Sequence, residues 1–506
     1  MYRPYVPVEP AWSKLTKARE AAPPAPRVLV AALASGMLAA QLFGDGLGVN
    51  LLLCALVATV GAVLVALSTG RRARPWTLAF AVSALVLTAI PAVSDDGLQS
   101  FLAVVASLAL ASLTLHGGRR WPGVLLGQIG LPAHIVHGVA WALKAGRTVR
   151  HPARAKVLPI VKAVGASIVL LVVFGSLFAA ADSTMADVLE SLVPSFDVGD
   201  LPLRAVFFVI GVLLALGAAH AAAAPRRWDR LATTPGRERG RLEWAIPLVV
   251  MNLLFGAFVL VQLVVLIGGY GEIMRRTGMT PAEYARQGFW QLLWVAVLTL
   301  AVIALATYWA PRTTPGDRRL VKVLLGLLCG LSLVVVATAL VRMKLYLDAF
   351  GLSEQRITVA ATEIWLGTVF LLVLVGGVLA GRSWLPRAVV LSGAVALAVF
   401  GLIRPDALVA EQNVARFEQS HRIDIGYLRD LSADAVPALD RLPGDYRDCA
   451  LQLIERDLEA DSNPWYGSSL AEARARDILR KHPVRNGSAA CARIGFSDSA
   501  YRDLDD

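Results

Sequence analysis

The feature that most constrains the fold is a succession of apolar stretches, 16 to 26 residues long, over the first 403 residues. A helix of about 20 apolar residues crosses the ~30 Å hydrocarbon core of a bilayer. We therefore predict eleven membrane spans, of which the first and last are short. Their residues are 28–43, 47–69, 76–93, 97–115, 157–180, 203–224, 243–268, 288–310, 320–342, 359–380 and 387–403.

Composition excludes the other broad classes of protein. Hydrophobic residues make up 56% of the chain and charged residues 17%, and the mean hydropathy is +0.59. A soluble chain of 506 residues could not bury that much apolar surface, and a disordered chain would be far more polar. Four cysteines are too few for a disulfide-rich scaffold. The chain is predicted to be an integral membrane protein.

The net charge of +11 is unevenly distributed. Residues 404–506 hold 14 Lys+Arg and 19 Asp+Glu, whereas the first 403 residues hold 35 and 19. The basic excess lies in short loops between apolar stretches, where membrane topology accounts for it, so we expect no nucleic-acid partner. Only 8 of the 49 basic residues are lysine, which is typical of a GC-rich bacterial genome. We expect a bacterial cytoplasmic membrane protein.

Basic residues alternate along the connections between spans. They collect in residues 1–27 and in the second, fourth, sixth, eighth and tenth connections, while the first and third have none and the fifth is acidic. Cytoplasmic loops carry the excess of Lys and Arg. The prediction is an all-α, polytopic transmembrane helical bundle at residues 28–403, with 1–27 inside and a small helical domain, 404–506, outside the cytoplasm.

Residues 121–143 complicate the span count. They are apolar, but Pro122, Gly130 and Pro132 are among the residues that interrupt them, and basic residues flank both ends. We predict an amphipathic or re-entrant helix on the cytoplasmic surface. The alternative is a twelfth span, which would reverse every later element. His134 and His137 in this segment are interpreted as packing residues, since no Cys or carboxylate is nearby in sequence, and we expect no metal site or cofactor.

The C-terminal domain has four helical patterns, at residues 407–419, 425–441, 445–459 and 468–482. Cys449 and Cys491 both fall in this domain. In an oxidising compartment they would form a disulfide, which constrains the unfolded chain. The alternative is two unpaired thiols.

Polar side chains within spans are the main functional pointers, because each must face protein or water. On this topology most of them gather toward the outer leaflet. We define the polar cluster as Asp182, Gln262, Gln287, Gln291, Arg342, Tyr346, Glu363, Asn413 and Arg416. Arg342 and Tyr346 are one helical turn apart, and Asn413 and Arg416 are expected over the bundle, near Glu363.

Two outer connections break the alternation of basic residues: the seventh holds Arg275, Arg276 and Arg286, and the ninth holds Arg342, Lys344 and Arg356. Three interpretations of these basic residues remain open. The arginines could dock the acidic C-terminal domain on the bundle, or they could line an outward-facing cavity for an anionic group such as a lipid phosphate or cell-wall precursor. An error in topology is the third. No Gly-rich phosphate loop, G-x-S-x-G, HExxH or CxxC motif occurs, so no catalytic residues are predicted.

Four stretches, at residues 175–189, 284–295, 342–358 and 413–439, carry a family resemblance. Together they resemble a bacterial family of multi-span membrane proteins catalogued only as a domain of unknown function, over about residues 70–442. The resemblance implies a membrane-embedded core and assigns no reaction.

The most favoured function is a non-enzymatic scaffold, or a sensory or accessory component, of an envelope or signalling complex. Its expected partners are the lipid bilayer and a protein of that complex. A transporter or lipid-handling protein is the alternative, although the sequence has no internal repeat of the kind that many carriers show. A membrane-embedded enzyme is third.

Overall fold

The computed structural model describes residues 23–43, 46–68, 74–148, 201–226, 228–231, 240–268, 289–309, 314–378, 382–460 and 463–496. Within these ranges the chain is helical and has no strand, so it is the all-α membrane bundle that the sequence predicts. It forms two compact units. One contains residues 1–231 and 461–473, and the other contains residues 232–460 and 474–506.

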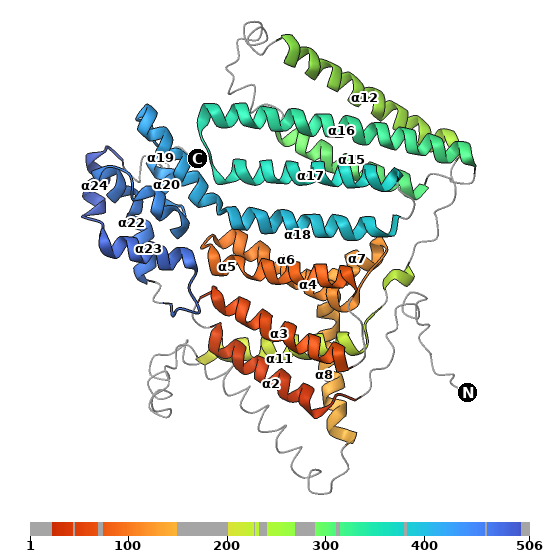
Figure 1. Cartoon of the computed structure of the whole chain (residues 1–506), viewed down its shortest axis with the longest axis horizontal. Helices are drawn as coiled ribbons and strands as arrows, with labels where there is room; N and C mark the ends of the chain where they lie inside the picture. Colours follow the sequence, from red (N-terminus) through yellow and green to blue (C-terminus); the bar gives the residue numbers. More distant parts are fainter. Residues whose placement is uncertain are drawn as a thin grey trace, which may run out of the picture. The chain divides into compact units, whose positions relative to one another are not determined.

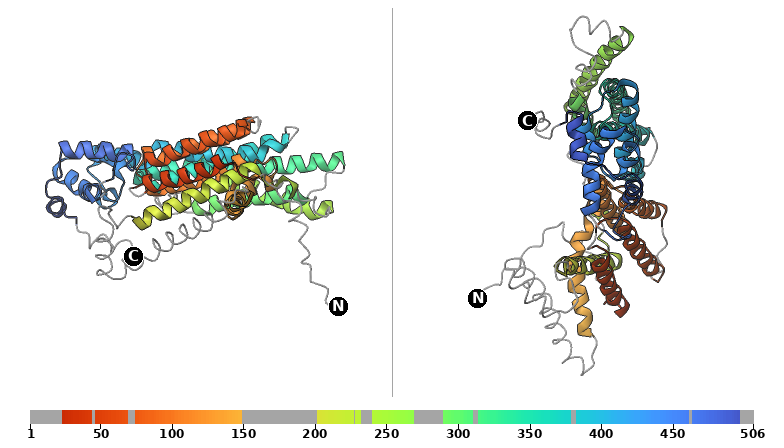
Figure 2. Two further views of the ribbon diagram at one scale, coloured as in Figure 1. Left: turned by 90° about the horizontal axis from the view of Figure 1, so that it is seen from below. Right: turned by 90° about the vertical axis from the view of Figure 1, so that its left-hand side faces the viewer.

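The first unit is a bundle crossed by one helix. Its helices α2, α3, α4, α6 and α11 run side by side, and α8 lies across them (Figure 1 and Figure 2). The bounds are α2 (Pro26–Leu42), α3 (Val49–Ser68), α4 (Pro75–Thr88), α5 (Ile90–Val93), α6 (Gly97–His116), α7 (Trp121–Gln128), α8 (Gly130–Thr148), α11 (Leu201–Ala223) and the 3-10 turn η1 (Trp228–Leu231).

Residues 121–143, which complicate the span count, fall on two helices instead of one. Helices α7 and α8 bend by 61° where they meet. Asp229 accepts hydrogen bonds from the backbone N–H groups of Arg119 and Arg120 just before α7, at 2.9 to 3.0 Å. The bend is compatible with a re-entrant or surface helix and with one broken span, so the choice between these interpretations stays a prediction.

Glycines allow the helices of the first unit to approach closely. A Cβ atom added at Gly211 of α11 would lie 2.8 Å from the Cβ of Ala39 on α2, and one added at Gly138 of α8 would lie 2.7 Å from the Leu216 carbonyl oxygen. Small residues at such crossings are typical of membrane helix packing, where dispersion contacts replace the hydrophobic effect.

The second unit has five long helices and a group of shorter ones. The long helices are α12 (Arg241–Gly268), α15 (Phe289–Trp309), α16 (Pro315–Phe350), α17 (Glu354–Val378) and α18 (Leu385–Ile403), with the 3-10 turn η2 (Arg382–Trp384) before α18. The shorter ones are α19 (Pro405–Ser420), α20 (Ile425–Arg429), η3 (Ala433–Ala435), α21 (Val436–Leu439), α22 (Gly444–Ala460) and α24 (Gly487–Arg493). Helix α23 (Leu470–Lys481) begins among the residues of the first unit and ends among those of the second.

Helical periodicity divides each long helix into a buried and an exposed face. On α17, Val359, Leu366 and Phe370 are 0 to 6% exposed, whereas Ile364 and Leu371 are more than half exposed. The same spacing buries one face of α12. An apolar face of this kind is stable in lipid, so the exposed leucines and isoleucines are the expected surface of a membrane protein.

Ten of the eleven predicted spans coincide with helices, and the predicted span 157–180 lies outside the described residues. Among described residues, eight helices are long and apolar enough to cross a membrane, or nine if the bent pair is one span. Helices α2 and α3 have shorter apolar stretches. The exact span count and the orientation stay predictions.

The structure differs from the sequence analysis in two places. The predicted helix 425–441 is broken after Arg429, because Asp406 of α19 accepts a hydrogen bond from the Ser432 backbone N–H at 2.9 Å. Helix α24 was not predicted. Helix α16 continues past the predicted span limit at residue 342 and ends at Phe350, with Gly351 as its C-cap at φ +81°. The predicted domain limits stay predictions, although Arg404 has left-handed backbone angles between α18 and α19.

Close helix packing gives a first prediction. Gly211→Ala should destabilise the protein by about 1 to 3 kcal/mol, because the new methyl group has no space between α2 and α11. Gly61→Ala on α3 is the matched control, since nothing lies within 4 Å of the added Cβ. The control should be neutral or stabilising by up to about 1 kcal/mol. Unfolding of the purified full-length protein in detergent measures both, and equal effects would contradict the packing at Gly211.

Candidate functional site

The buried face of α12 carries two amide side chains at membrane depth. Asn252 and Gln262 are 7% and 8% exposed. The Asn252 amide nitrogen donates to the carbonyl of Leu248 at 2.7 Å and, across the helix interface, to the carbonyl of Leu324 on α16 at 3.2 Å. Its amide is therefore used to join α12 to α16.

Arg342 and Gln262 form the second polar link between the same two helices. The Arg342 Nη2 donates to the Gln262 Oε1 at 2.8 Å. The sequence analysis expected Arg342 to act beside Tyr346, one turn along the same helix. The Arg342 side chain extends to the neighbouring helix and pairs there, and a joint role with Tyr346 stays a prediction.

Glu363 is the acidic residue of the predicted polar cluster that falls within the described residues. It is 2% exposed and lies on the buried face of α17, between Val359 and Leu366. Its Oε2 has no hydrogen-bond partner within the described residues. Burying a polar atom without a hydrogen-bond partner costs free energy. Glu363 is therefore a candidate functional residue.

A compact set of contacts lies where α16 turns into α17. The guanidinium of Arg356 stacks over the Tyr346 ring, with 4.4 Å between its central carbon and the ring centroid, and its Nη1 donates to the Gly351 carbonyl at 2.6 Å. Gly351 has φ +81°, a left-handed conformation that favours glycine. These contacts fix the turn, residues 351–353.

Helix α19 holds this turn from the other side. The Asn413 amide nitrogen donates to the Leu352 carbonyl at 3.0 Å and to the Val409 carbonyl at 2.8 Å. A Cβ atom added at Gly351 would lie 2.7 Å from Nη1 of Arg416. Asn413 thus binds the turn and Arg416 lies against it, whereas the expected meeting with Glu363 stays a prediction.

The turn is also part of the hydrophobic core of the C-terminal helices. Leu352 is 8% exposed and belongs to the core formed by α19 to α24, and Leu347 of α16 and Ile357 of α17 pack against that core. The Glu354 backbone N–H donates to the hydroxyl oxygen of Tyr427 on α20 at 2.8 Å. We define the junction as this shared core together with the contacts of residues 346–357, Asn413, Arg416 and Tyr427.

The other members of the predicted cluster do not enter the junction. Asp182 and Gln287 lie outside the described residues. The Gln291 side chain is exposed on α15. Whether the nine residues form one site stays a prediction. Among those described, they form an α12–α16 link, a buried carboxyl group and the junction.

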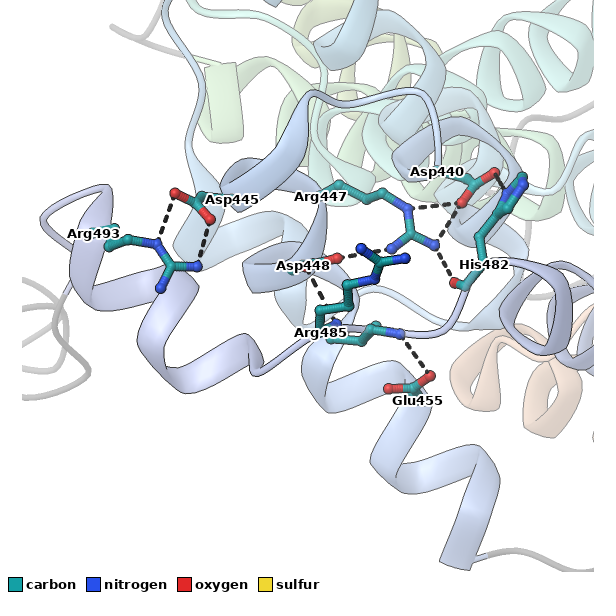
Figure 3. A network of polar contacts seen from close by, with 9 residues as sticks. Asp440, Asp445, Arg447, Asp448, Glu455, His482, Arg485 and Arg493 are labelled. Carbon is teal, nitrogen blue, oxygen red and sulfur yellow. Dashed lines mark hydrogen bonds and ion pairs between the residues drawn. The ribbon is translucent and has the colours of Figure 1, made fainter.

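The C-terminal helices are held together by a disulfide and a network of ion pairs. Cys449 of α22 is bonded to Cys491 of α24, and their Cα atoms are 4.8 Å apart. Arg447 pairs with Asp440 and Asp448, each at 2.8 Å, and also donates to the His482 carbonyl (Figure 3). These bonds fix α22 and α24 relative to the end of α23.

Four histidines of the first unit form a cluster that the sequence analysis missed. His134 and His137 of α8 lie against His116 at the end of α6 and His220 in the last turn of α11. The four are up to 104 residues apart in sequence. In the sequence, His116 and His220 each lie near the cytoplasmic end of a predicted span, and residues 121–143 were predicted on the same side. This shared position was the one indication of the cluster.

Comparison with known proteins gives a family and no further relative. The family model "Domain of unknown function (DUF4153)" matches residues 81–442, which is more than two thirds of the chain, so the chain belongs to this family. No curated protein and no solved structure matches.

The ion-pair network of the C-terminal helices includes a pair between Asp445 and Arg493, and this pair predicts that the stability of these helices depends on pH. Both carboxylate oxygens of Asp445 accept hydrogen bonds from Arg493, at 2.6 and 2.9 Å, and this guanidinium lowers the pKa of Asp445 (Figure 3). A carboxyl group whose pKa is lower in the folded state stabilises the fold above its unfolded pKa of about 3.9. That contribution is lost as the pH falls through the folded-state pKa.

We therefore expect hydrogen exchange in residues 440–496 of the full-length protein to speed up when the pH drops below about 4, after correction for intrinsic exchange rates. Asp445→Asn should remove part of this pH dependence and leave neutral-pH exchange slightly faster. Asp457→Asn, an exposed residue on the same helix, is the control. An identical pH profile for the wild type and Asp445→Asn would contradict the assignment.

Proposed function

We propose that this DUF4153 protein is a non-enzymatic scaffold or sensory component of a bacterial envelope complex, in which the C-terminal helical domain lies outside the cytoplasmic membrane and binds a protein partner. The observation that carries the proposal is the junction. The core of the C-terminal helices includes Leu352 of the α16–α17 turn, so a force or a binding event on these helices acts directly on two transmembrane helices.

Polar contacts make this coupling specific. Hydrophobic contacts alone would let the C-terminal helices slide on the turn, whereas hydrogen bonds fix one arrangement. Asn413 binds the Leu352 carbonyl, and Tyr427 accepts from the Glu354 N–H. Arg404, between α18 and α19, pairs with the buried Asp434 at 3.6 Å. The two connections between bundle and C-terminal helices in this unit are therefore both held by polar pairs.

The proposed sidedness has support within the first unit. The Asn50 backbone N–H, in the first turn of α3, donates to the Tyr466 carbonyl at 2.7 Å. The distribution of basic residues places both the α2–α3 connection and the C-terminal domain on the outer side. A direct contact between two segments assigned to the same side supports that assignment.

Burial of the polar residues favours a scaffold over a carrier. A carrier with a polar pathway would have water-filled space near mid-membrane. Asn252 and Gln262 are instead buried and bonded to neighbouring helices. The alternative, a transporter or lipid-handling protein, is favoured by one observation, the buried Glu363 with an unpartnered Oε2, since such acids mark ion and proton pathways in membrane proteins.

The proposal is tested by a substitution that weakens the junction. The measurements are the coupling between the C-terminal helices and the α16–α17 turn, and the binding of the partner. Asn413→Ala removes two hydrogen bonds and leaves the Leu352 carbonyl without this donor, at a cost of about 1 to 3 kcal/mol. Hydrogen exchange of the full-length protein in nanodiscs should become faster in residues 346–358 as well as in α19. Gln412→Ala, at the exposed neighbouring position, is the matched control and should change neither segment.

The same variants are then cross-linked in native membranes and purified. We expect the wild type and Gln412→Ala to retain one envelope protein in fixed stoichiometry, and Asn413→Ala to lose most of it. The proposal is wrong if no stoichiometric protein is retained by the wild type while Glu363→Gln abolishes uptake of a solute or lipid, because that result selects the transporter alternative.

A further inference from the structure

A short uncharged segment interrupts the charged C-terminal domain. Residues 404–506 hold 14 Lys+Arg and 19 Asp+Glu, but none of these falls within residues 463–470, NPWYGSSL. We define the Trp465 loop as residues 463–470. Two of its apolar side chains are exposed, Trp465 at 73% and Leu470 at 61%. Large exposed apolar side chains that lie close together in sequence mark a surface that binds a partner or lipid.

Local hydrogen bonds fix the shape of the Trp465 loop. The Gly467 backbone N–H donates to the Pro464 carbonyl at 2.9 Å and closes a β-turn, in which Trp465 takes the first of the two central positions. Helix α23 then begins with a capping contact, because the Ser469 hydroxyl oxygen accepts from the Glu472 backbone N–H at 3.0 Å. Trp465 therefore lies at the tip of an ordered turn.

The Trp465 loop packs on the connection between α2 and α3 within the first unit. The Asn50 backbone N–H, in the first turn of α3, donates to the Tyr466 carbonyl at 2.7 Å. A Cβ atom added at Gly46, which has φ +94°, would lie 2.7 Å from the Gly467 carbonyl oxygen. A Cβ atom added at Gly48 would likewise overlap a carbonyl group of the loop. The two segments are thus in direct backbone contact.

The α2–α3 side of this contact is also ordered. Asn50 is fully buried, and its Oδ1 accepts hydrogen bonds from the backbone N–H groups of Gly48 at 2.9 Å and Leu51 at 2.8 Å. Its Nδ2 donates to the Gly46 carbonyl at 2.8 Å. Because both sides of the contact are held by hydrogen bonds, the position of Trp465 relative to α3 is defined.

That position is close to the membrane surface. Helix α3 begins at Val49, inside the predicted span 47–69, and Trp465 directly precedes the residue whose carbonyl Asn50 binds. Trp465 therefore lies near the level at which α3 enters the hydrocarbon. Tryptophan is enriched at this level, because its ring contacts acyl chains while its N–H group reaches the headgroups.

We propose that the Trp465 loop is a membrane anchor, in which Trp465 and Leu470 insert into the headgroup region of the leaflet where α3 begins. Helix α3 brings the bilayer to this point in every copy of the protein, whereas the loop has no charged side chain to select a protein partner. The anchor holds the start of α23 at the membrane. The proposal is independent of the scaffold or sensory function and holds for either orientation of the protein.

The first test measures the depth of the loop with Trp465 intact. A nitroxide is attached to Leu470→Cys in the full-length protein, with Cys54 and Cys329 replaced by alanine, in nanodiscs of phosphatidylethanolamine and phosphatidylglycerol. Electron paramagnetic resonance then measures collisions of the nitroxide with lipid-soluble oxygen and with a water-soluble nickel chelate. We expect collisions with oxygen to be frequent and most collisions with the chelate to be lost.

The control is a nitroxide at Asp457→Cys, an exposed position on α22, which the nickel chelate should reach freely. The anchor proposal is overturned if the chelate reaches position 470 as freely as position 457. That result would leave the loop in water, as a surface open to a protein partner.

The second test changes the tryptophan itself and follows hydrogen exchange of the full-length protein in the same nanodiscs. Trp465→Ser should speed exchange in residues 463–473 and in the peptide that contains Asn50 by about tenfold, since partial burial of a large apolar side chain contributes a factor of about this size. Trp465→Tyr should exchange nearly as the wild type does, because tyrosine also favours the membrane interface. Equal exchange for the wild type and Trp465→Ser, or equally fast exchange for Trp465→Ser and Trp465→Tyr, would contradict the anchor.

Discussion

Hydrogen bonding of polar groups within the membrane determines how the helices of this protein pack. An unpaired polar group in lipid costs several kcal/mol, so pairing with another element stabilises the bundle, whereas Glu363 Oε2 and Asn252 Oδ1 have no hydrogen-bond partner among the described residues. In the second unit, Asn252 binds a carbonyl of α16, and Arg342 of α16 binds Gln262 of α12. These links set which faces of the helices meet, and the apolar remainder of each helix is left for lipid.

The same requirement shapes the end of the α16–α17 pair. Backbone groups in a turn lack helical partners, and here they are satisfied by side chains from α17, α19 and α20. Arg356 binds the Gly351 carbonyl, Asn413 binds the Leu352 carbonyl, and Tyr427 accepts from the Glu354 N–H. Leu352 is also part of the core of the C-terminal helices. The same residues therefore satisfy the backbone groups of the turn and attach the C-terminal helices to it.

Sequence reasoning predicted what depends on local periodicity. The positions of the membrane helices follow from the lengths of the apolar stretches. The hydrogen-bond partners of the polar side chains depend on tertiary packing, and the sequence analysis did not predict them. Asn413 and Leu352 are 61 residues apart, and His134 and His220 are 86 apart. The pairing of Arg342 with Gln262, 80 residues apart, was not predicted either.

The most direct test of the account is the location of the C-terminal disulfide in intact cells. The account predicts that Cys449 and Cys491 resist thiol reagents until a membrane-impermeant reductant is added outside, and that an impermeant maleimide then labels both. Cys54 and Cys329, on the membrane helices α3 and α16, serve as the reference. Free thiols at 449 and 491 that react only after the membrane is permeabilised would contradict the outward orientation and the scaffold or sensory function proposed from it.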